Sequence, residues 1–188
     1  MLPFELDISR KWNIARKAFT LKTLNLEEKK AIFDSIAKTD SSDKKVEEAH
    51  VFDAITASKE HFEELYQTLK SPDRSISMTV KQLITAGWRN HVHYEWLSTE
   101  YREKYFKDII SLSSVLDYSQ LQFFYNRLKP LDDNIQSQLD SYRAVVKQLE
   151  ETNDESGELK VHAKEIMRIV DDLEKKKANY AFNSAVKN

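Results

Sequence analysis

Apolar residues in the last third of the chain recur in alternating steps of four and three, and this spacing restricts the fold more than any other feature. One series is Leu131, Ile135, Leu139, Tyr142, Val146 and Leu149; a second is Leu159, Ala163, Ile166, Val170, Leu173, Lys177 and Tyr180. Such spacing is typical of the seam between two packed helices. The polar segment 151–157 separates the two series, so we predict an antiparallel helix pair that is coiled-coil-like.

The remainder of the chain also carries helical signals. Asn25 with Glu28, and Asp117 with Gln120, have the spacing of capping boxes, which open helices. Apolar residues at helical spacing predict longer helices over about 44–70 and 78–112, the latter with a change of phase near Gly87. No stretch alternates between β-branched and polar residues as a strand would. We therefore predict an all-α protein, an elongated up-down bundle of four or more helices.

We expect the loop at 39–43 to divide the chain into two parts. We expect residues 1–43 to form N-terminal helices that dock on a continuous long-helix bundle formed by 44–188. The first helix shows apolar residues over about half of its circumference, which favours docking on the protein body. These residues are Ile8, Trp12, Ile14, Ala15, Ala18, Phe19 and Leu21.

Composition excludes several classes of site. The chain has no cysteine, so it has no disulfide, thiolate metal site or cysteine nucleophile. Its two glycines, Gly87 and Gly157, lie too far apart for a glycine-rich phosphate loop. The net charge of −2 provides no overall attraction for nucleic acid. We accordingly expect no cofactor and no nucleic-acid partner.

One histidine cluster is the only concrete enzymatic hypothesis. His91 and Glu95 share a helix face, and both side chains are common metal ligands. His93 points away from them on a helix, so the remaining ligands would have to come from elsewhere, with His50 and His61 as candidates. Because too few ligands converge locally, we assign no catalytic, cofactor or metal residues.

Aromatic residues in the predicted helix 78–112 suggest a protein contact. The change of phase implies more than one apolar stripe, and a helix covered on one side needs only one. We therefore assign a protein-binding role to Trp88, Trp96, Tyr101 and Tyr105.

The basic N-terminal helix supports a different interpretation. Arg10, Lys11, Arg16 and Lys17 alternate with apolar residues, as in helices that lie on a membrane surface. No segment has the length and hydrophobicity of a transmembrane helix or a secretory signal. A cytoplasmic or nuclear location is the resulting expectation.

These observations favour a non-catalytic helical scaffold or adaptor that binds other proteins within an intracellular complex, with a homodimer among the compatible arrangements. A membrane-surface module, either BAR-like or anchored by the amphipathic helix, is the first alternative. A metal-dependent helical-bundle enzyme is the second.

Overall fold

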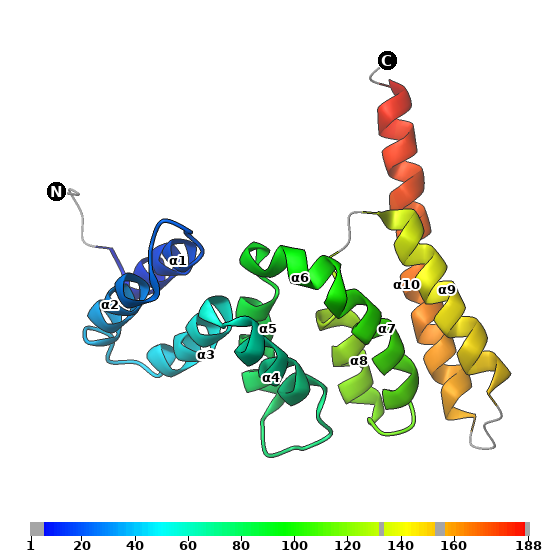
Figure 1. Ribbon diagram of the computed structural model, residues 1–188, viewed down its shortest axis with the longest axis horizontal. Coiled ribbons are helices and arrows are strands. Elements are labelled where there is room, and N and C mark those ends of the chain that lie inside the picture. The colour runs from blue at the N-terminus through cyan, green and yellow to red at the C-terminus, as the bar shows by residue number, and fades with distance from the viewer. Residues whose placement is uncertain (1–5, 132–133, 153–156, 187–188) are drawn as a thin grey trace. The chain divides into compact units, whose positions relative to one another are not determined.

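The computed structural model describes residues 6–131, 134–152 and 157–186, and these residues contain only helices and connections (Figure 1). The all-α prediction is confirmed. The helices are α1 (Ile8–Phe19), α2 (Leu26–Ala37), α3 (Lys44–Thr56), α4 (Lys59–Lys70), α5 (Met78–Trp88), the short 3-10 helix η1 (His91–His93), α6 (Tyr94–Ser98), α7 (Glu100–Leu112), α8 (Tyr118–Arg127), α9 (Ile135–Glu151) and α10 (Glu158–Val186).

Side-chain caps define where several helices begin. Both predicted capping boxes are present: Asn25 accepts from the backbone N–H of Glu28, and Asp117 accepts from that of Gln120. In return, the side chains of Glu28 and Gln120 accept from the backbone N–H groups of Asn25 and Asp117. Each box thus provides acceptors for two N–H donors that lack a partner within the helix.

The two longest predicted helices are interrupted. Segment 44–70 breaks at Ala57, because the Ser58 hydroxyl accepts from the backbone N–H of His61 and starts α4. Segment 78–112 is divided into α5, η1, α6 and α7. Asn90 caps η1 by accepting from Val92 N–H, so the predicted change of phase reflects a sequence of shorter helices.

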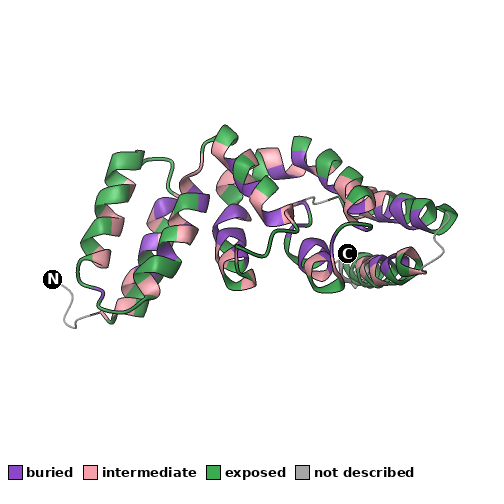
Figure 2. Ribbon diagram, turned by 90° about the horizontal axis from the view of Figure 1, so that it is seen from below, coloured by how far each residue is buried: buried purple, intermediate pink, exposed green. Residues whose placement is uncertain are grey.

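The chain separates into two compact units, 1–95 and 96–188. The expected boundary after residue 43 falls within the first unit, between α2 and α3. As a statement about domain organisation, that boundary stays a prediction. Figure 2 shows buried and exposed residues on different sides of many of the helices.

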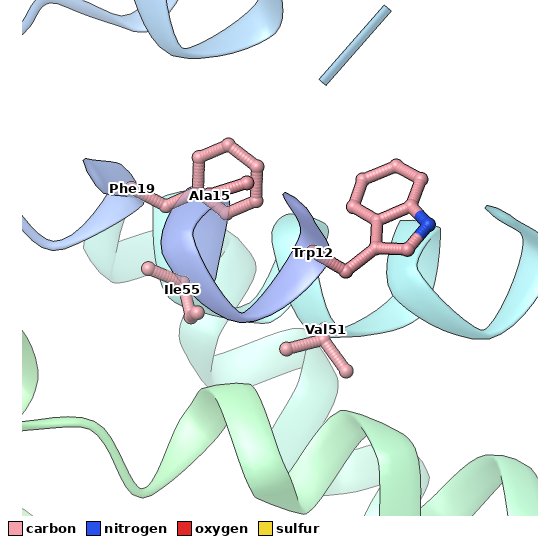
Figure 3. Packing of buried hydrophobic residues seen from close by; sticks show 5 residues of the cluster. All are labelled: Trp12, Ala15, Phe19, Val51 and Ile55. Carbon is pink, nitrogen blue, oxygen red and sulfur yellow. The ribbon is translucent and has the colours of Figure 1, made fainter. Parts of the chain in front are cut away.

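The first unit has an apolar cluster between α1, α2 and α3. Trp12, Ala15 and Phe19 of α1 pack with Val51 and Ile55 of α3 (Figure 3). Phe33 of α2 contacts the Trp12 ring with a centroid separation of 5.2 Å. Helix α1 therefore packs on α2 and α3, and Ile14 and Leu21 lie outside the buried face.

The second unit has an aromatic core and a C-terminal helix pair. Tyr105 of α7 stacks on Phe124 of α8 with centroids 5.0 Å apart, and its hydroxyl lies 3.3 Å from that of Tyr142 in α9. Helices α9 and α10 lie side by side (Figure 1). Arg143 pairs with Glu174, and Lys177 donates to Gln136 at 2.5 Å, so the two helices run antiparallel.

Some residues of each predicted seam are buried in this unit. The residues that are buried are Leu139, Tyr142, Val146 and Leu149 from α9 and Ala163, Ile166 and Val170 from α10. The two seam positions nearest the C-terminus, Lys177 and Tyr180, are exposed. Side-chain burial therefore ends before the seam pattern does.

Candidate functional site

The four aromatic residues predicted to bind protein lie mainly inside their own units. Trp88, Tyr101 and Tyr105 are fully buried, and Trp96 is half-buried. The Trp88 ring stacks on Phe62 with centroids 4.7 Å apart. The Tyr101 ring stacks on Trp96 at 5.1 Å, and the Tyr101 hydroxyl donates to the Leu128 carbonyl. In this structure these side chains hold helices together and do not form a docking surface.

The histidine and glutamate residues of the metal hypothesis do not converge. His91 and Glu95 are exposed, whereas the half-buried His93 donates from Nε2 to the Ala54 carbonyl at 2.9 Å. His61 lies between carboxylates of α3 and its own helix. Among the described residues, no three metal-ligating side chains are close enough to share an ion.

Two histidines of the first unit have opposite electrostatic environments. His61 Nε2 lies 2.9 Å from the Asp53 carboxylate and Nδ1 lies 3.1 Å from that of Glu64. Hydrogen bonds to Asp53 and then Glu64 raise the pKa of His61. Burial against Phe62 lowers the pKa of His93, because the apolar surroundings disfavour the charged ring.

These shifts predict a stability maximum for the first unit near pH 6.5, the usual pKa of histidine. The stabilising contribution of His61 is fully present below that value and is lost as the pH rises through its raised folded-state pKa. The contribution of His93 is present above that value and is lost as the pH falls through its lowered folded-state pKa. Urea midpoints measured between mildly acidic and mildly basic pH test this dependence.

Two variants isolate the alkaline side of the maximum. Asp53→Asn removes the strongest cause of the His61 shift, and His61→Gln removes the titrating group. Each variant should reduce the loss of stability of the first unit above neutral pH. Asp171→Asn makes the same charge change as Asp53→Asn but in the second unit, so it should leave this loss unchanged. A decline that persists in both His61-site variants would contradict the assignment.

The four basic residues predicted at a membrane surface do not behave alike. Lys17 is exposed and Lys11 is half-buried. Arg10 is exposed and lies 3.3 Å from the Asp7 carboxylate. Arg16 instead points toward α3, where Nε and Nη2 donate to the Glu48 carboxylate at 2.6 and 2.7 Å. Glu48 is only 1% exposed, so Arg16 neutralises a buried charge inside the unit.

Sequence analysis missed the exposure of several large apolar side chains. On and just after α1, Ile14 is 55% exposed, Leu21 is 49% and Leu26 is 59%; on α10, Tyr180 is 57% exposed. Sequence spacing did not distinguish them, because an apolar residue can fit the helical repeat whether its side chain is buried or exposed. For Ile14, the separation from the buried Trp12 was informative, since residues two apart lie on opposite sides of a helix.

One polar groove lies in the second unit, between α7 and the start of α9. It measures about 490 Å³ and is lined by Arg102, Asn134, Gln136, Ser137, Asp140, Ser141 and Ala144. Arg102 Nη2 donates to the hydroxyls of Ser137 and Ser141, both at 2.7 Å. These bonds join α7 to α9, which gives Arg102 a structural role.

Comparison with known proteins identifies no relative. No family, no curated protein and no solved structure matches the chain. Among the described residues, none of the helices is both long enough and apolar enough to cross a membrane.

Proposed function

We propose that this protein is a non-catalytic helical scaffold or adaptor of the cytoplasm or nucleus, and that it binds a partner protein through the α10 tip, residues 174–180. The observation that carries the proposal is the difference in length between the paired helices. Lys177 of α10 already lies opposite Gln136, near the start of α9, yet α10 continues to Val186. In Figure 1 the end of α10 extends past α9.

The α10 tip has no buried residue, although Glu174 and Lys177 still contact Arg143 and Gln136 of α9. Each residue from Glu174 to Tyr180 is exposed, and this segment spans nearly two helical turns. Short helices are marginal in water unless an apolar face packs against something. A partner helix packed against the tip would bury this part of α10, as α9 packs against its first half.

The side chains of the α10 tip favour an acidic partner. Lys175, Lys176 and Lys177 follow one another and point in different directions around the helix. Lys176 Nζ lies 5.9 Å from the Tyr180 ring centre. Arg143 pairs with Glu174, the one acidic residue in the tip. An amphipathic helix with carboxylates flanking an apolar stripe would complement both the charge and the exposed ring.

Affinity capture from source cells, with a photo-crosslinking residue placed at position 180, tests the proposal. We expect a near-stoichiometric protein partner that crosslinks at position 180. Tyr180→Ser combined with Lys176→Glu should abolish its capture, while the exposed control Lys160→Glu should retain it. A solitary chain, or a partner retained equally by both variants, would refute the role of the α10 tip.

A further inference from the structure

A second surface, on the outer side of α1, points to a different ligand. Arg10, Ile14 and Lys17 are spaced four and three residues apart, so they lie along one stripe of α1, and Leu21 follows two residues after the helix ends. The Leu21 N–H donates to the Ala18 carbonyl at 3.0 Å, so a turn holds Leu21 against the end of α1. We call these four residues the α1 stripe. The buried residues Trp12, Ala15 and Phe19 face the other way.

The α1 stripe combines exposed apolar and basic side chains. Ile14 and Leu21 are each about half exposed, and Leu26 is exposed at the start of α2, just after the stripe. Lys17 and the neighbouring Lys22 are exposed and form no ion pair with any described residue. The stripe therefore presents both components of interfacial binding, apolar side chains and positive charge.

Acidic residues flank the stripe at Asp7 and at Glu27 and Glu28, but none lies between them. Between Ile8 and Leu26 there is no aspartate or glutamate, whereas the basic residues are Arg10, Lys11, Arg16, Lys17 and Lys22. Arg10 forms an ion pair with Asp7 at the beginning of α1, and Arg16 forms an ion pair with Glu48 of α3. Lys17 and Lys22, near the end of α1, therefore lie next to Leu21 without a carboxylate partner among the described residues.

We propose that the α1 stripe, with Lys22 and Leu26, is a contact site for an anionic lipid bilayer. A bilayer is favoured over a protein partner because the stripe is a single exposed helix face, and a bilayer needs no matching shape. Two or three exposed apolar side chains provide limited area, so binding requires the added attraction of anionic headgroups. This site is separate from the α10 tip, and either proposal can fail without the other.

Vesicle co-sedimentation of the full chain tests the site. We expect binding to phosphatidylcholine vesicles that contain phosphatidylserine, release at high salt, and no binding to phosphatidylcholine alone. Each basic residue near an anionic surface strengthens binding about fivefold. Lys17→Gln with Lys22→Gln should therefore weaken partitioning by about 25-fold. Ile14→Ser with Leu21→Ser should also reduce it strongly.

A matched control separates the stripe from general charge. Lys160→Gln with Lys164→Gln removes the same charge from exposed positions on α10 and should leave binding within about twofold of the parent chain, since it lies outside the stripe. All three double variants should keep the parent's melting temperature, because the altered side chains are exposed. Absence of binding to anionic vesicles at low salt, or equal loss in the control, would overturn the proposal. Preferential binding to an acidic polypeptide would likewise overturn it in favour of a protein ligand.

Discussion

Gly87→Ala is expected to destabilise the first unit by about 3 kcal/mol, toward the upper end of the cost of overpacking. A Cβ atom at position 87 would lie 2.3 Å from the Val51 carbonyl oxygen and 2.9 Å from the Ala54 Cβ. The nearest atom belongs to the backbone of α3, so no side-chain rotation relieves the clash. Helices α3 and α5 would have to move apart where Gly87 meets Val51.

The sign of this effect makes the test decisive. Intrinsic helix propensity alone predicts that alanine stabilises a helix by about 1 kcal/mol relative to glycine. Urea denaturation of Gly87→Ala should show the opposite, and hydrogen exchange should speed up in α3 and α5. The neighbouring exposed Ala86 provides the control, since Ala86→Gly should cost no more than about 1 kcal/mol. A Gly87→Ala variant as stable as the parent would refute the close approach.

Arg16→Met is expected to destabilise the first unit by about 3 kcal/mol, because it leaves the Glu48 carboxylate buried without its cation. The Glu48 side chain is 1% exposed and that of Arg16 is 38% exposed. We place the cost at the lower end for a broken buried pair because water partly screens the exposed guanidinium. The free energy of unfolding from urea titration measures the loss.

Two further variants distinguish charge from packing at this pair. Arg16→Met combined with Glu48→Met replaces the ion pair with apolar side chains and should recover most of the loss, since buried pairs replaced in this way are often neutral. Arg10→Met is the matched control, because Arg10 pairs with the exposed Asp7 and should cost less than about 1 kcal/mol. Equal losses for Arg10→Met and Arg16→Met would refute the special role of Glu48.

Several polar residues illustrate why sequence spacing does not predict which polar side chains are buried. Asp40 lies in a predicted loop, yet it is buried and accepts from the Trp12 indole N–H at 2.8 Å. Lys81 is also buried and donates to the Ser71 carbonyl at 2.7 Å. In both cases the partner is distant in sequence, and a hydrogen bond is what makes burial of the polar group tolerable.

The sequence by itself determined the helical class and both capping boxes. Those features depend on residues within four positions of one another, where helical geometry sets which side chains are neighbours. Tertiary structure decided which apolar stripes are covered. It buried Trp88, Tyr101 and Tyr105, left Ile14, Leu21 and Tyr180 exposed, and turned Arg16 toward Glu48. Burial depends on where other helices lie, and the spacing of residues along one helix does not fix those positions.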